Sequence, residues 1–82
     1  MDYLEVLAVL DDVLLARLVD PVDHQPLLYV ASEDLLYNPR RHRAFPVRDG
    51  IAVLLEDESR EVTLEEGDAL ERNASARWTA SA

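Results

Sequence analysis

Two carboxylates and two imidazoles are the side chains of this chain whose types and spacing could support chemistry. Asp20, Asp23 and His24 lie close together, and His42 follows in a second polar segment. Such groups can bind a metal ion or transfer protons. However, the chain offers no Gly-rich phosphate loop and no nucleophile elbow, and its 82 residues leave little volume for a deep pocket. Aspartate is common in turns, so we predict turns rather than an active site, no enzymatic activity and no cofactor.

A second group of side chains is basic. Arg40, Arg41, Arg43 and Arg48 are half of the eight basic residues in a chain of net charge −9. They could contact RNA beside a partner enzyme, or form a solvated loop that neutralises the protein's own acidic groups. The net charge argues against non-specific nucleic-acid binding by the chain alone. The absence of cysteine excludes a disulfide and a thiolate metal site.

The N-terminal part contains an apolar pattern with helical spacing that Asp11 interrupts. Because a buried unpaired carboxylate is costly, we expect a break at Asp11, which then caps a helix over Asp12–Leu18. Tyr3–Leu10 could be helix or strand. Pro21 disfavours helical geometry in the residue before it, so residues 19–26 are predicted to form a tight, polar knuckle.

Two hairpins are predicted in the middle of the chain. Leu27–Val30 and Leu35–Tyr37 flank a four-residue loop, which pairs Val30 with Leu35, Tyr29 with Leu36 and Leu28 with Tyr37. Asp49 and Gly50 separate two apolar runs, 44–48 and 51–55, and Asp-Gly at such a place is the strongest short-range hairpin signal.

The strand after that turn is apolar throughout. A run without alternation is either buried on both faces or available to a partner. We expect it near a sheet edge, where another chain can add a strand. The predicted partner-binding residues are Phe45, Ile51, Val53, Leu54 and Leu55.

The C-terminal part carries one clear helix signal. Thr63 and Glu66 have the spacing of a capping box and predict a short helix over Leu64–Glu71. Residues 73–82 are small and polar and are expected to form a frayed, flexible tail. Trp78 either packs loosely there or anchors a partner. We expect a single domain over residues 1–82, with its core at about 12–60.

Residues 3–10 are too few, and lack the basic flank, to be a signal peptide or a membrane span. The expected compartment is therefore the cytoplasm.

Two segments resemble a known family. Leu14-Leu15-Ala16-Arg17-Leu18-Val19-Asp20-Pro21-Val22-Asp23 is similar to L-L-E-I-L-A-C-P-V-C, and residues 44–55 are similar to A-Y-P-I-R-D-G-I-P-V-L-L. These are motifs of the bacterial YcaR-type group of small proteins. That group is related to the small zinc-ribbon subunit that activates tRNA, rRNA and protein methyltransferases. The resemblance covers residues 14–60. It implies a partner methyltransferase that is bound by pairing of sheets and that itself holds S-adenosylmethionine.

The chain departs from this family at its metal ligands. The first cysteine pair is replaced by Asp20 and Asp23, and the second pair, where present, falls at Asn38 and Arg41. The resemblance therefore implies a knuckle without metal. In it, Arg41 pairs with Asp20 or Asp23, and Asn38 bonds the backbone.

These observations predict an α+β fold: an N-terminal helix against a small antiparallel sheet of three or four strands, zinc-ribbon-like but metal-free. The first functional hypothesis is a non-catalytic subunit that docks on a methyltransferase. The second is a stand-alone protein that self-associates, as a homodimer, through the same apolar strand. A metal-dependent enzyme is a third reading.

Overall fold

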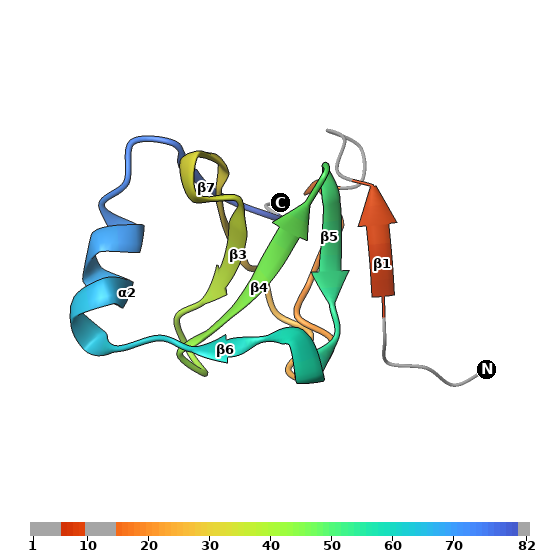
Figure 1. Cartoon of the computed structure of the whole chain (residues 1–82), viewed down its shortest axis with the longest axis horizontal. Coiled ribbons are helices and arrows are strands. Elements are labelled where there is room, and N and C mark those ends of the chain that lie inside the picture. The colour runs from red at the N-terminus through yellow and green to blue at the C-terminus, as the bar shows by residue number, and fades with distance from the viewer. Residues whose placement is uncertain (1–5, 10–14, 81–82) are drawn as a thin grey trace.

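The computed structural model of the chain describes residues 6–9 and 15–80. Within them, the backbone forms mostly antiparallel strands joined by short loops (Figure 1). The strands are β1 (Val6–Val9), β2 (Leu28–Val30), β3 (Leu35–Asn38), β4 (Arg43–Arg48), β5 (Ile51–Leu54), β6 (Arg60–Glu61) and β7 (Ala76–Trp78). The helices are α2 (Leu64–Glu71) and two 3₁₀ turns, η1 (Ala31–Glu33) and η2 (Glu56–Glu58). The sheet order is β1-β5-β4-β3-β2-β7, and β6 pairs with β4.

The prediction of an N-terminal helix against the sheet is wrong. Residues 12–14 lie outside the described residues; Leu15 is helical, but residues 16 and 17 form a turn and the helix does not reach Leu18. Leu15 and Leu18 are nevertheless buried. These two apolar residues therefore belong to a turn that packs on the sheet. Upstream, Val6–Val9 forms a strand that pairs with β5. The helical layer comes instead from α2, at the other end of the chain (Figure 1).

The sheet is also larger than the three or four strands that were expected. Seven strands belong to it among the described residues. The additional strands come from β1, β6 and β7, whose partners are distant in sequence. Pairing over such distances has no local sequence signature.

The first predicted hairpin is confirmed in its register. β2 and β3 pair Val30 with Leu35, Tyr29 with Leu36 and Leu28 with Tyr37. The loop between them is η1 followed by Asp34, whose φ of 51° lies in the left-handed region that Asp tolerates.

The Asp-Gly hairpin is confirmed as well. Asp49 and Gly50 have φ values of 53° and 76°, which is the geometry of a two-residue type I′ turn. Arg48 lies opposite Ile51, and Val47 lies opposite Ala52. Directly opposite residues share one face of a sheet, so this turn decides which side chains of β5 face the core.

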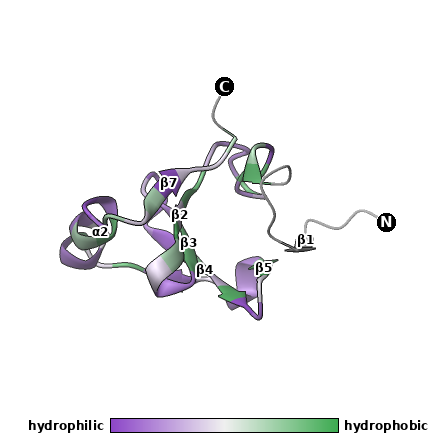
Figure 2. Cartoon of the chain, turned by 90° about the horizontal axis from the view of Figure 1, so that it is seen from above, coloured by the Kyte–Doolittle hydropathy of each residue, from purple (hydrophilic) through white to green (hydrophobic). Residues whose placement is uncertain are grey.

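The two faces of the sheet carry separate apolar clusters. The first cluster consists of Leu15, Leu18, Leu27, Leu36, Phe45, Val47, Ala52 and Leu54. The second lies on the other face and consists of Leu28, Val30, Leu35, Tyr37, Ala44, Val62 and Leu70. Seen from above, α2 stands on one side of β2, β3 and β4, while β5 and β1 lie on the other (Figure 2). Leu70 of α2 therefore covers part of the second face of the sheet.

The C-terminal part forms a helix as predicted and also a strand that was not expected. The capping box is confirmed: Thr63 Oγ1 accepts a hydrogen bond of 3.1 Å from the Glu66 amide, and α2 spans the predicted residues. Residues 76–78, expected in a frayed tail, form β7 and pair with β2. Thr79 is buried, and its hydroxyl accepts from the Leu27 amide at 2.8 Å and donates to the Leu18 carbonyl at 2.7 Å.

None of the helices in the described part of the chain has the length and apolarity needed to cross a membrane.

Candidate functional site

The first knuckle is organised by Asp20. Its side-chain Oδ1 accepts hydrogen bonds from the amides of Val22, at 2.6 Å, and Asp23, at 3.3 Å. Its backbone amide donates to the Gln25 carbonyl at 3.0 Å. An aspartate side chain that bonds the backbone of the following residues is a typical turn-forming element. The predicted knuckle is therefore present and rests on Asp20.

The second knuckle repeats this chemistry with an amide. Asn38 stands at the end of β3, and its Oδ1 accepts from the amides of Arg40, at 2.8 Å, and Arg41, at 3.2 Å. The expected bond between Asn38 and the backbone is thus present. Its Nδ2 group remains available to donate to the first knuckle.

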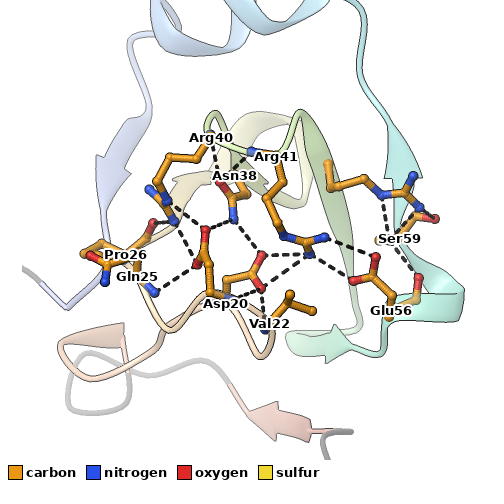
Figure 3. Close-up of polar contacts among 11 residues, drawn as sticks. Asp20, Val22, Gln25, Pro26, Asn38, Arg40, Arg41, Glu56 and Ser59 are labelled. Atoms are coloured by element: carbon orange, nitrogen blue, oxygen red, sulfur yellow. Dashed lines mark hydrogen bonds and ion pairs between the residues drawn. The ribbon is translucent and has the colours of Figure 1, made fainter.

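The two knuckles meet through their side chains (Figure 3). Asn38 Nδ2 donates to Asp20 Oδ2 at 2.7 Å and to Asp23 Oδ2 at 3.0 Å. Arg41 Nη2 lies 3.1 Å from Asp20 Oδ2, which is the ion pair that the sequence predicts. The structure therefore brings together the four residues that the resemblance aligns with cysteines: Asp20, Asp23, Asn38 and Arg41.

Two further residues complete this cluster, and neither was predicted to lie with the four knuckle residues. Arg40 Nε lies 2.9 Å from Asp23 Oδ2, and its Nη2 donates to the Pro26 carbonyl at 2.7 Å. Glu56 Oε1, from η2, lies 2.9 Å from Arg41 Nη2. The arginine-rich loop thus neutralises the protein's own carboxylates, which was one of the two readings of that loop. Nothing local to Glu56 indicates its partner.

Electrostatics explain why this cluster tolerates burial. The Asp20 side chain is completely buried, a position that an ionised carboxylate occupies only with good partners. The hydrogen bond from Arg40 lowers the pKa of the Asp23 carboxyl to about 2. Hydrogen bonds to Glu56 raise the pKa of the Arg41 guanidinium above its usual value. The cluster is therefore a network of charged groups that compensate one another.

This arrangement has little capacity for metal or proton chemistry. The carboxylate oxygens of Asp20 and Asp23 accept N–H groups from Asn38, Arg40 and Arg41, so a cation would have to displace donors that already occupy them. The described residues contain no group of three histidine, cysteine or acidic side chains that could hold a metal ion. His24 is exposed, and His42 is half-buried with a φ of 54°.

The predicted partner strand, β5, lies one strand in from the edge of the sheet. β5 pairs with β4 on one side and with β1 on the other, so it is not an edge of the sheet. Phe45, Val53 and Leu54 are buried, and Leu55 is half-buried. Ile51 is 38% exposed and is the one residue of the predicted set that faces solvent. The role of these residues in partner binding stays a prediction.

Comparison with known proteins adds to this geometry. A family model described as "Trm112p-like protein" matches residues 11–50. A UPF0434 protein of Teredinibacter turnerae is 49% identical over 57 residues, which are 70% of this chain and 89% of that relative. The chain belongs to the UPF0434 family of Trm112p-like proteins. The resemblance inferred from residues 14–60 is therefore confirmed.

Two further relatives are similar to this chain, a second UPF0434 protein and a kinase. UPF0434 protein GOX0764 of Gluconobacter oxydans is 45% identical over 53 residues, which are 65% of this chain and 90% of that protein. A tetraacyldisaccharide 4'-kinase of Verminephrobacter eiseniae is 47% identical over 57 residues, which are 70% of this chain and 13% of that protein. In the kinase, the UPF0434-like sequence is one segment of a longer chain. No solved structure matches this chain.

Proposed function

We propose that this UPF0434 protein is a non-catalytic subunit that docks on an S-adenosylmethionine-dependent methyltransferase, acting on RNA or protein, and activates or stabilises it. The observation that carries the proposal is the match of the Trm112p-like family model to residues 11–50. In this proposal, the partner enzyme holds S-adenosylmethionine and performs the reaction. The working compartment is then the cytoplasm.

A non-catalytic role is supported by the state of the polar cluster. A general acid or base must exchange a proton with a substrate and needs access to it. Asp20 is completely buried, and Asp23 already accepts hydrogen bonds from Asn38 and Arg40. These side chains hold two loops together, which is a structural role.

The docking surface that we propose is the exposed side of the β4–β5 hairpin. Ile51 lies directly opposite Arg48, and both are exposed. Val53, two residues further along β5, shares the face of Ile51 because side chains alternate along a strand, but it is buried, so Ile51 and Arg48 are the residues of this face that a partner can contact. Pairing of a partner strand with β5 itself would require β1 to leave, since β1 occupies that edge.

Affinity capture from native lysate, read by mass spectrometry, tests this function. The wild-type chain is compared with Ile51→Asp and with Leu64→Asp as a matched control, because Leu64 is 73% exposed and lies on α2. We expect the wild type and the control to capture a methyltransferase, and Ile51→Asp to capture about ten-fold less. Circular dichroism checks that each variant is folded. Recovery of the chain alone would favour self-association and contradict the proposal.

A second candidate partner comes from one relative. The segment of the Verminephrobacter eiseniae tetraacyldisaccharide 4'-kinase that resembles this chain is covalently joined to that kinase. A segment that is fused to an enzyme in one organism can bind the separate enzyme in another. Capture of such a kinase, in place of a methyltransferase, would support this alternative.

A further inference from the structure

A pocket of about 280 Å³ opens on the face of the sheet that carries the second apolar cluster. Leu35 and Ala44 are buried members of that cluster and line the pocket. Pro46, which shares their face because it lies two residues beyond Ala44, is half-buried beside them. No residue of α2 lines the pocket, so this is a part of the apolar face that the helix leaves open.

The walls of the pocket are fixed by contacts that do not depend on a ligand. On the β3 side, the Asp34 carbonyl accepts a hydrogen bond of 2.9 Å from the Val47 amide. On the β6 side, Arg48 Nη1 lies 3.2 Å from Glu58 Oε1, which joins the end of β4 to η2. A pocket whose walls are held in this way needs little reorganisation to receive a side chain.

The charges around the pocket are unequal. Arg48 and Arg60 line it, but each is already paired, with Glu58 and with Glu66 respectively. Glu33 and Asp34 line the opposite side, and neither has an ion pair within the described part of the chain. Two carboxylates are thus left over in a protein whose net charge is −9. This side of the pocket attracts a cation.

We propose that this pocket receives a large apolar side chain of a partner protein, with a lysine or arginine of the same partner beside it. The volume of about 280 Å³ accommodates a single large side chain. Leu35, Ala44 and Pro46 form an apolar part of the lining that accepts the anchor, and Glu33 and Asp34 accept the cation. Ile51, opposite Arg48 on the same face, extends the apolar surface.

This inference deepens the proposed function and rests on it, because it states what the partner must present. An apolar anchor in a pocket supplies most of the affinity of many interfaces. The charge beside it selects among partners and speeds association. The partner surface that fits here is therefore apolar at its centre and basic at its rim.

Titration of the isotopically labelled full chain with two capped pentapeptides tests the proposal. The sequence of the first is Gly-Arg-Leu-Arg-Gly, and the second has glutamate in place of arginine. We expect the basic peptide to shift the amide signals of Leu35, Ala44 and Arg48, and the acidic peptide to leave them unchanged. Equal shifts with both peptides, shifts centred elsewhere, or no shift with either would overturn the proposal.

A pair of charge variants sharpens this test. Glu33→Gln combined with Asp34→Asn should lower the affinity for the basic peptide about three- to ten-fold. The fold should be kept, because asparagine tolerates the positive φ of residue 34. Glu65→Gln combined with Asp68→Asn removes the same charge from α2 and should leave binding unchanged. Equal weakening in both double variants would show a non-specific charge effect and refute the site. Because the peptides replace the partner, capture of a methyltransferase succeeds or fails independently of this result.

Discussion

Arg41 Nη2 lies 3.1 Å from Oδ2 of Asp20, whose side chain is completely buried, and this pair joins the two knuckles. Arg41→Ala would leave the buried carboxylate with one donor fewer, so we expect a loss of about 1–3 kcal/mol of unfolding free energy. Arg40→Ala is the control, because Arg40 is 36% exposed and its pair with Asp23 should contribute at most about 1 kcal/mol. Urea denaturation measures both; equal midpoints for Arg41→Ala and the wild type would contradict this account of the cluster.

Acid stability should depend on Asp23. The pKa of its carboxyl falls from 3.8 to about 2 on folding, through the hydrogen bond from Arg40. A group whose folded pKa is lowered stabilises the protein above its unfolded pKa and loses that contribution as the pH falls through the folded value. Between pH 4 and pH 2, the free energy of unfolding of the wild type should therefore fall by about 1 kcal/mol more than that of Asp23→Asn, after allowance for solvent screening. Parallel curves of melting temperature against pH would refute this.

Much of the local structure could be predicted because its causes are local. The register of β2 with β3 follows from the length of one loop, the β4–β5 turn follows from Asp49 and Gly50, and α2 follows from the capping box at Thr63. The contact of Arg41 with Asp20 could be inferred only after the family resemblance had aligned both residues with lost ligands. Each of these features depends on neighbours in sequence or on a known motif.

The remaining features depend on contacts between distant segments. β1 and β7 were not predicted as strands of this sheet, because their partners, β5 and β2, are more than forty residues away. Glu56 was not predicted as a partner of Arg41 for the same reason, because the fold alone brings these two residues together. The sequence placed 51–55 near a sheet edge, but only the structure shows that β1 covers the outer side of β5.

Thr79 should stabilise the fold from the C-terminal end. Its buried hydroxyl joins Leu18 and Leu27, the residues on either side of the first knuckle. Thr79→Val keeps the shape but leaves two backbone groups without a partner, which should cost about 1–3 kcal/mol for each bond lost. Thr79→Ser retains the hydroxyl and should cost much less. Thermal unfolding distinguishes them; a valine variant as stable as the serine variant would show that the hydroxyl contributes nothing.

Gly50 should be required for its backbone conformation. A β-carbon added at this position would meet no atom of the described residues within 4 Å, and φ is +76°, so the penalty for a larger residue is conformational rather than steric. We expect Gly50→Val to lower the free energy of unfolding by about 1–3 kcal/mol. Gly50→Asn should lower it less, because asparagine tolerates positive φ. Dispersion of the amide spectrum reports the hairpin. A valine variant with the dispersion and stability of the wild type would contradict the turn.

We propose that this chain has no reaction of its own and acts by docking on a methyltransferase. Methyl transfer from labelled S-adenosylmethionine, measured for the captured enzyme with and without the chain, tests this claim most directly. The account predicts no transfer by the chain alone, a higher rate or a longer active lifetime of the enzyme in its presence, and loss of that effect with Ile51→Asp but not with Leu64→Asp. Transfer by the chain alone, or an enzyme unaffected by the chain, would contradict it.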